Sequence, residues 1–335
     1  MDVARTLTGA AVGAVALAGA GRNSRVFKVT SDEGPFAMKS YPPVAADGRD
    51  RLGTEYAALT FLHAAGQCAT PRPLARKDET RVALYEWIEG QTIDMPCDRD
   101  IEEAVEFVKH LYRVSRAAEA ADISNATESC LSAKEIFRQV EGRLNRLVQV
   151  AEDHHRLQTF LALEIEPAFQ QCTKQLVDGY AQSSLEVDTE ILPSIRILSP
   201  SDFGFHNALR RPDGSLYFVD FEYFGWDDPV RLVCDFLLHP GMTLSAHHRR
   251  LFRDAMLDIF LDDNDFSSRI RFLYPLVVLR WCMILLNEFL PEKWAARASS
   301  ENADAIEAAQ TKQLEKARTM LGHLDEPLVK LDHAQ

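Results

Sequence analysis

A tight turn over residues 210–215 is the feature that most constrains how this chain folds. Asp213 and Gly214 stand at its centre, and the residues that follow, 215–219, are rich in strand formers. A hairpin of this kind would return Asp220 to the side of Asn207. The turn therefore predicts that two oxygen-bearing side chains from distant positions converge, as a hard cation requires.

A third such side chain, Asp202, lies five residues before Asn207 in the same loop. Transfer of a γ-phosphoryl group requires one carboxylate to orient and deprotonate the acceptor hydroxyl, and further oxygen ligands to hold Mg²⁺ on the phosphates. The spacing of Asp202, Asn207 and Asp220 matches this requirement. Upstream, residues 18–25 form a small-residue loop between two apolar strand-like stretches, which suits close approach of the backbone to phosphates.

The motifs between these two regions follow in the order that a nucleotide site requires. Residues 35–39 end in Lys39 and are predicted to form a strand, and Glu55 follows in a helical pattern. Together these motifs resemble the aminoglycoside phosphotransferase and choline kinase family, relatives of the protein kinases. The resemblance implies that Lys39 and Glu55 pair. The chain departs from the family pattern at Pro200, where a His is usual, in the loop between Asp202 and Asn207, and at Leu232, where an Asp is frequent.

The resemblance implies an α+β, bilobal, protein-kinase-like fold. A small β-rich N-lobe over residues 1–89 would bind the nucleotide, and a larger, mainly helical C-lobe over residues 90–335 would carry catalysis and the acceptor. Asp202 would be the catalytic base and Asn207 and Asp220 the Mg²⁺ ligands. ATP is the expected nucleotide, with GTP as the alternative. The expected nucleotide-binding residues are Gly19, Gly21, Asn23, Ser24, Lys39, Glu55, Glu86 and Ile88.

Residues 84–90 match the family's hinge, a strand that leaves the small lobe and turns at Gly90. By position, the Glu86 carbonyl and the Ile88 amide would bind adenine, and Tyr85 would line the back of the pocket. The side chain of Glu89 either is solvated or holds ribose or substrate.

Residues on the acceptor side are inferred from the neighbourhood of these motifs. His206 contacts the substrate or braces the loop, and Arg280 either faces the acceptor or pairs with an acid in the core. The full set of candidates is His206, Glu222, Trp226, Asp227 and Arg280.

The predicted function is transfer of the ATP γ-phosphoryl group to a hydroxyl of a small molecule, such as an amino sugar, a sugar or an amino alcohol. A protein substrate is disfavoured, because Asp228 and Pro229 begin a helix almost directly after Asp220 and leave no room for a long activation segment. Two alternatives stay open: a catalytically inactive nucleotide-binding scaffold, and a nucleotidyl transferase on the same fold.

The negative charge is concentrated in the second part of the chain. Residues 1–90 carry 11 Lys and Arg against 10 Asp and Glu, whereas residues 91–335 carry 26 against 40. This acidity disfavours a nucleic acid partner and suits a cationic acceptor, although surface carboxylates also serve solubility. The six cysteines form no Cys-x-x-Cys pair and are expected to be reduced thiols in the core. The pattern does not indicate an oligomeric state.

Two apolar segments raise a membrane or export interpretation. Residues 7–20 resemble a signal peptide, but cleavage after Ala20 would cut the phosphate loop, so a strand is favoured. Residues 272–290 include Arg280 and Glu288, which are costly in hydrocarbon, so a buried helix is favoured. A cytoplasmic enzyme without a membrane partner is expected.

The remaining chain is predicted to be mostly helical. The pattern predicts an amphipathic helix behind an Asp100 cap, and further helices after the Ser132 capping box and after Asp228. Residues 157–176 and 299–324 are also predicted to be helical.

Overall fold

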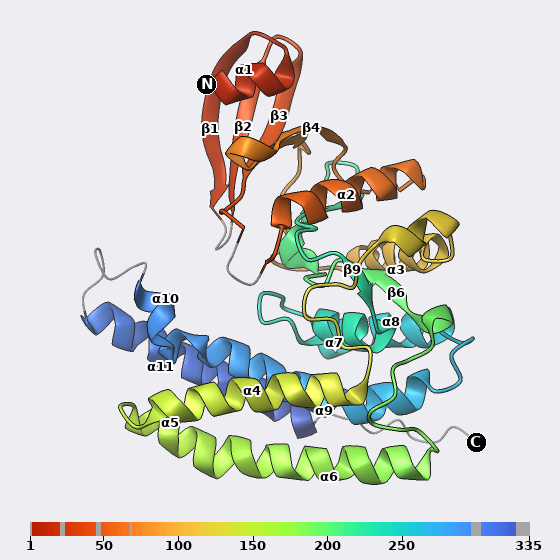
Figure 1. Cartoon of the computed structure of the whole chain (residues 1–335), viewed down its shortest axis with the longest axis vertical. Coiled ribbons are helices and arrows are strands. Elements are labelled where there is room, and N and C mark those ends of the chain that lie inside the picture. The colour runs from red at the N-terminus through yellow and green to blue at the C-terminus, as the bar shows by residue number, and fades with distance from the viewer. Residues whose placement is uncertain (1, 21–23, 45–47, 68, 296–302, 326–335) are drawn as a thin grey trace. The chain divides into compact units, whose positions relative to one another are not determined.

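The computed structural model describes residues 2–20, 24–44, 48–67, 69–295 and 303–325. It divides into two compact units (Figure 1). The first unit comprises residues 1–129, 197–227 and 242–248, and the second comprises residues 130–196, 228–241 and 249–335. The predicted lobe boundary between residues 89 and 90 stays a prediction.

The first unit is built on a five-stranded antiparallel sheet with the strand order β1-β2-β3-β5-β4. Asp32 and Glu33 connect β2 to β3 as a two-residue hairpin loop, and Gly34 beyond it has φ +112°, which only glycine adopts easily. The strands are β1 (Val12–Ala20), β2 (Arg25–Ser31), β3 (Gly34–Ser40), β4 (Pro73–Lys77) and β5 (Val82–Glu86).

The two faces of this sheet have different chemistry, because side chains alternate along each strand. Val29, Met38 and Leu84 lie on one face, in an apolar cluster with Ala4 of the N-terminal helix α1 (Asp2–Thr8). Lys39, next to Met38 in β3, is directed to the other face. Helix α2 (Arg51–Ala64) supplies the partner of that lysine, as described below.

The rest of the first unit carries the predicted catalytic loop. It contains α3 (Asp98–Val114) and two short strand pairs. Strand β6 (Ile197–Ser199) pairs with β9 (Gly225–Asp227), and β7 (Ala208–Arg210) pairs with β8 (Leu216–Phe218). The β7–β8 pair confirms the hairpin predicted from the turn at Asp213 and Gly214.

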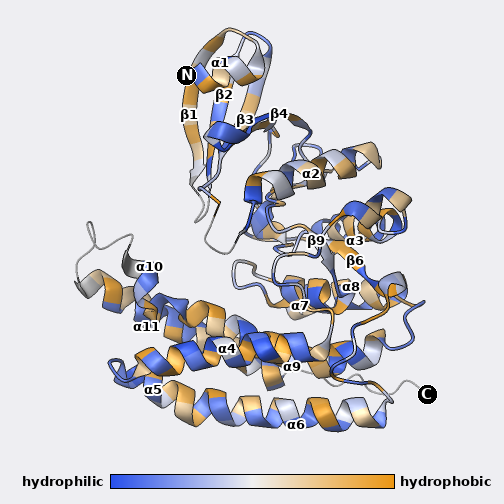
Figure 2. Ribbon diagram, viewed as in Figure 1, coloured by the Kyte–Doolittle hydropathy of each residue, from blue (hydrophilic) through white to orange (hydrophobic). Residues whose placement is uncertain are grey.

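The second unit is helical, and α9 (Phe266–Leu285) lies at its centre, in contact with α4, α6, α7 and α11. Apolar and polar residues share the surfaces of α4 and α6, as Figure 2 shows. The other helices are α4 (Ala133–Ala151), α5 (His155–Phe160), α6 (Glu166–Gln182), α7 (Pro229–Leu238), α10 (Pro291–Ala295) and α11 (Ala303–Leu321). Helix α8 (Ala246–Ile259) is shared between the two units.

Several local predictions are confirmed. Ser132 caps α4 by accepting from the Glu135 amide, and Asp228 caps α7 by accepting from the Val230 amide. Within the described residues, one stretch, Phe266–Phe289, is long and apolar enough to cross a membrane, and 67% of its most apolar window is buried inside the protein. This burial agrees with the predicted core helix over residues 272–290.

Other local predictions need correction. The helix predicted behind Asp100 begins at Asp98, and the Asp100 carboxylate instead accepts from the Cys97 amide at 2.7 Å, one turn back. Asp100 was mistaken for the cap because the same carboxylate chemistry serves both positions. Cys97 is exposed, whereas the other described cysteines, Cys130, Cys172, Cys234 and Cys282, are buried thiols.

The predicted helix and strand boundaries also shift in three segments. Residues 7 and 8 belong to α1, so the predicted strand over residues 7–20 begins only at Val12. The helix over residues 157–176 is interrupted by a π-helical turn at Leu161–Ile165, and Pro167 stands in the first turn of the helix that follows. Residues 299–302 of the last predicted helix lie outside the described residues.

The packing of α6 on α9 leaves no space for a side chain at Gly179. A Cβ added there would lie 2.2 Å from a ring carbon of Phe272. We expect Gly179→Ala to destabilise the protein by about 1–3 kcal/mol, because the core is overpacked. Gly142→Ala in α4 meets no atom within 4 Å and is the matched control, which should stabilise by about 0.5–1 kcal/mol. Thermal unfolding of the full chain measures both, and equal shifts would contradict the packing argument.

Candidate functional site

Lys39 lies between two carboxylates that come from distant parts of the chain. Its Nζ donates to Glu55 Oε2 of α2 at 2.6 Å and to Asp220 Oδ1, which follows the β7–β8 hairpin, at 2.7 Å. Only 7% of the lysine side chain and 4% of that of Glu55 are exposed, whereas Asp220 keeps 35%. The predicted pairing of Lys39 with Glu55 is confirmed. The more exposed partner of the lysine is Asp220.

Burial and charge act in opposite directions on this lysine. Burial lowers the pKa of Lys39, but the negative charges of Glu55 and Asp220 outweigh it and hold the pKa above its usual range. Burial also raises the pKa of the Glu55 carboxyl, against the opposing effect of Lys39. Lys39 is therefore a permanent cation, and it has a strong anionic environment.

Two buried tyrosines support Glu55 from behind. The Tyr41 hydroxyl donates to Glu55 Oε2 at 2.8 Å, the same oxygen that accepts from Lys39. Since that hydroxyl has one hydrogen, Tyr85 must donate to Tyr41 across their 2.7 Å contact. Burial, and then the charge of Glu55, raises the pKa of both phenols well above its ordinary value. Both therefore remain neutral donors.

The hairpin brings Asn207 and Asp220 onto neighbouring backbone. The Val219 amide donates to the Asn207 carbonyl at 2.8 Å, one residue before Asp220. Asp220 has φ +69°, a conformation unusual outside glycine, which re-aims its side chain at the end of the strand. Asn207 Nδ2 donates to the Asp202 carbonyl at 2.9 Å, so its Oδ1 is the atom that remains for a cation.

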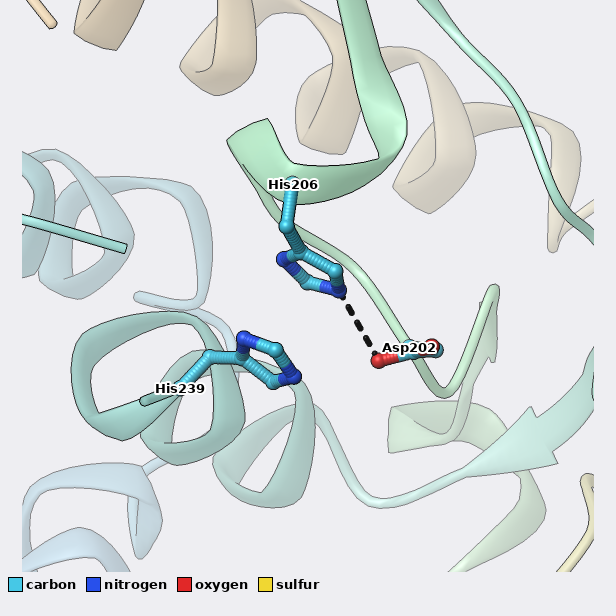
Figure 3. Close-up of side chains that lie close together, drawn as sticks. All are labelled: Asp202, His206 and His239. Atoms are coloured by element: carbon cyan, nitrogen blue, oxygen red, sulfur yellow. Dashed lines mark hydrogen bonds and ion pairs between the residues drawn. The ribbon is translucent and has the colours of Figure 1, made fainter. Parts of the chain in front are cut away.

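The loop of Asp202 is held by two contacts, of which only the one made by His206 was considered in the sequence analysis. His206 Nε2 lies 3.0 Å from Asp202 Oδ1 (Figure 3), and the Phe205 amide contacts the Met242 sulfur at 3.0 Å. A Cβ at Gly204 would lie 2.7 Å from that sulfur, so a larger residue there would require the Met242 side chain to shift. Of the two roles considered for His206, the structure shows the brace on Asp202.

Glu222 lies beside Lys39, and its predicted role on the acceptor side stays a prediction. Its Oε2 is 3.9 Å from Lys39 Nζ, and one oxygen of each of Glu55, Asp220 and Glu222 lies within 4.8 Å of the others. We call these three residues the acid cluster. Glu222 Oε1 also lies 3.4 Å from Arg51 Nε, the first residue of α2. Arg51 was not predicted from the sequence, although it stands one helical turn before Glu55.

The predicted hinge over residues 84–90 begins within β5, but the strand ends at Glu86 and residues 87–90 lie outside it. Glu86 pairs with Phe36 of β3, and Ile88 is buried. Gly90 is needed for close packing, because a Cβ there would lie 3.1 Å from the Arg210 carbonyl oxygen. Glu89 is exposed and accepts from the Trp87 indole at 2.8 Å, which agrees with a solvated hinge acid. Adenine binding by Glu86 and Ile88 stays a prediction.

The remaining predicted residues lie as follows. Gly19 is in β1 and Ser24 directly precedes β2, while Gly21 and Asn23 lie outside the described residues. The Trp226 indole donates to the Ala120 carbonyl at 3.2 Å, and Asp227 is fully buried.

Arg280 belongs to the second unit. There it donates to Gln139 at 2.9 Å and lies 3.6 Å from Asp235. This is the pairing with a core acid that was the alternative reading of Arg280.

The hydrogen-bond relay from Tyr85 through Tyr41 to Glu55 generates a prediction about stability. Tyr41→Phe leaves the buried Tyr85 hydroxyl without its acceptor, which should cost about 1–3 kcal/mol. Tyr85→Phe should cost less, and the double variant should cost little more than Tyr41→Phe alone, because both partners are then removed. Chemical denaturation checks this, with Tyr56→Phe, whose ring centroid lies 6.3 Å from that of Tyr85, as the control. Additive losses would contradict the relay.

Comparisons with known proteins agree with this geometry. The model of the phosphotransferase enzyme family matches residues 14–263. A search of curated proteins found no match. Among solved structures, an aminoglycoside phosphotransferase from Alicyclobacillus acidocaldarius has a TM-score of 0.61 at 12% identity and covers 98% of this chain and 96% of its own.

Two further structures have nearly the same similarity. Choline kinase from Streptococcus pneumoniae has a TM-score of 0.59 at 12% identity, over 96% of this chain and 98% of its own. A spectinomycin phosphotransferase, in complex with ADP and spectinomycin, has 0.60 at 12% identity, over 98% and 95%. These likenesses confirm the predicted fold, and the family match covers most of the chain. The chain belongs to the phosphotransferase enzyme family.

Proposed function

We propose that the protein transfers the γ-phosphoryl group of ATP to a hydroxyl group of a small molecule. Family membership points to a small-molecule phosphotransferase. The observation that carries the proposal is the double contact of Lys39, with Glu55 at 2.6 Å and Asp220 at 2.7 Å. A buried lysine held between a helix and the end of a hairpin is the arrangement that protein-kinase-like enzymes use to hold nucleotide phosphates.

The residues present fit a magnesium ion. Asp220, Glu222 and the Oδ1 of Asn207 offer oxygen ligands only, and the acid cluster holds three carboxylates against the cations Lys39 and Arg51. Oxygen ligands and an excess of negative charge are what hard divalent cations require. When bound, the ion would neutralise charge on the phosphates of the nucleotide.

The roles of the protein groups follow from their positions. Lys39, held by Glu55, would bind the α- and β-phosphates, and Glu86 and Ile88 would bind the adenine with their backbone. Asp202 would accept the proton of the acceptor hydroxyl while the new O–P bond forms and the bond to ADP breaks. His206 holds the Asp202 carboxylate in place.

The acceptor is proposed to be an amino sugar, a sugar or an amino alcohol. The excess of acidic residues after residue 90 supports a cationic acceptor. The solved structures that resemble this chain include a choline kinase and a spectinomycin phosphotransferase. These names state what those two proteins act on, and they support the proposed class of acceptor by similarity alone. The division into a nucleotide-binding lobe over residues 1–89 and a catalytic lobe over residues 90–335 belongs to this proposal, as does a cytoplasmic location.

Turnover of ATP against a panel of amino alcohols, sugars, amino sugars and aminoglycosides tests the function. Mass spectrometry of the product separates phosphoryl transfer from nucleotidyl transfer. ATP binding without any product would instead favour an inactive nucleotide-binding scaffold.

Replacement of Asp202 tests its role as the base. Asp202→Asn should lower kcat roughly 10²- to 10⁴-fold, because general base catalysis contributes about this much, while ATP affinity changes little. Asp213→Asn, at the exposed tip of the hairpin, is the matched control and should keep normal turnover. Undiminished kcat in Asp202→Asn would refute the assignment.

Metal dependence provides a separate test by titration calorimetry. Chelation of Mg²⁺ should weaken ATP binding, because the acid cluster then repels the phosphates. Asp220→Asn should raise the Mg²⁺ concentration needed for half-maximal ATP binding, and Asp213→Asn should leave it unchanged. Binding that is indifferent to Mg²⁺ in the unmodified protein would contradict the metal site.

A further inference from the structure

Arg51 lies beside the phosphate site and shares a carboxylate with Lys39. Arg51 and Glu55 are one helical turn apart on α2, so their side chains leave the same face of the helix. Glu55 binds Lys39, while Arg51 Nε lies 3.4 Å from Oε1 of Glu222. The other oxygen of Glu222 lies 3.9 Å from Lys39 Nζ. Both cations therefore flank one carboxylate of the acid cluster.

The position of Arg51 is costly for the stability of α2. Only 12% of its side chain is exposed, and among the described residues its buried Nε makes no hydrogen bond. A buried donor without an acceptor loses free energy. A cation in the first turn of a helix also opposes the helix dipole. The helix itself does not explain why an arginine stands at this position.

The chemistry of Arg51 explains its position better. A guanidinium carries five N–H donors in a planar fork that matches phosphate oxygens. Near the guanidinium lies the Tyr223 ring, whose centroid is 5.9 Å from Cζ, and Glu222 holds the Nε side. The Tyr223 side chain also hydrogen-bonds Arg51 and Glu222. The 3.4 Å contact between Arg51 Nε and Glu222 is longer than a usual charge-assisted hydrogen bond, so a more highly charged anion can compete for the guanidinium.

We propose that Arg51 is a second cationic residue of the phosphate site and binds the β- or γ-phosphate of the nucleotide together with Lys39. In the free protein, Glu222 holds the guanidinium beside the site. The inference rests on the proposed function, since it assigns a further residue to the same nucleotide. It identifies the ligand as a nucleoside di- or triphosphate rather than a monophosphate.

Equilibrium binding of ATP and of AMP, each with excess Mg²⁺, tests the role of Arg51 without knowledge of the acceptor. Arg51→Gln should weaken ATP binding roughly 10- to 100-fold, the loss expected for a charge-assisted hydrogen bond, and leave AMP binding within about twofold. Arg51→Lys, which keeps the charge but loses the fork, should lie between the two. Arg49→Gln is the matched control, because Arg49 stands two residues away and pairs with Glu128 at 3.5 Å.

The outcomes separate the two proposals. If the unmodified protein binds neither nucleotide, both the proposed function and the role of Arg51 are overturned. If it binds ATP and Arg51→Gln binds ATP equally well, only the role of Arg51 is overturned. An equal loss for ATP and AMP also overturns it, because that pattern reflects general damage. Should Arg51→Gln fail to fold in a thermal unfolding scan, the ATP-to-AMP affinity ratio of Arg51→Lys decides in the same way.

Discussion

The buried ammonium group of Lys39 links segments of the first unit that lie far apart in the sequence. A charge taken out of water costs several kcal/mol unless partners compensate it. Here the compensation comes from Glu55 on α2 and from Asp220 beyond the hairpin, at 2.6 and 2.7 Å. Lys39 thereby connects strand β3 to helix α2 and to the segment that follows β8. The phosphates of a nucleotide would bind at the same place.

The surroundings of this lysine differ on its two sides. Behind it, the buried Tyr41 phenol donates to Glu55, and the buried Tyr85 phenol donates in turn to Tyr41. In front, Asp220 is partly exposed and Glu222 adds a further negative charge. Low polarity on the closed side strengthens each charge interaction, whereas the open side leaves carboxylate oxygens available to a cation. The site is therefore buried on the side of Tyr41 and Tyr85, and its carboxylate oxygens are accessible to a cation on the side of Asp220.

The loop from Asp202 to Asn207 keeps the two side chains proposed to act in catalysis and metal binding, although its sequence departs from the family pattern. The chain lacks the usual His-Pro-Gly sequence of the family between Asp202 and Asn207. In its place, His206 binds the Asp202 carboxylate, the Met242 sulfur accepts from the Phe205 amide, and Gly204 permits this contact. The altered loop thus still holds Asn207 to Asp202, through the hydrogen bond from Asn207 Nδ2 to the Asp202 carbonyl.

The family resemblance carried by the order of motifs along the chain predicted the fold and the Lys39–Glu55 pair. The hairpin that brings Asp220 to Asn207 was predicted from turn chemistry alone, because a tight turn is encoded by neighbouring residues. The cap at Asp100 and the exposure of Cys97 were predicted wrongly from the same local patterns, whereas the acceptor-side role of Glu222 stays a prediction. Only the tertiary structure placed Tyr41, Met242 and Arg51 at the site. Their roles depend on burial and on contacts between segments far apart in the chain, and no local pattern encodes which distant atoms share a low-dielectric space.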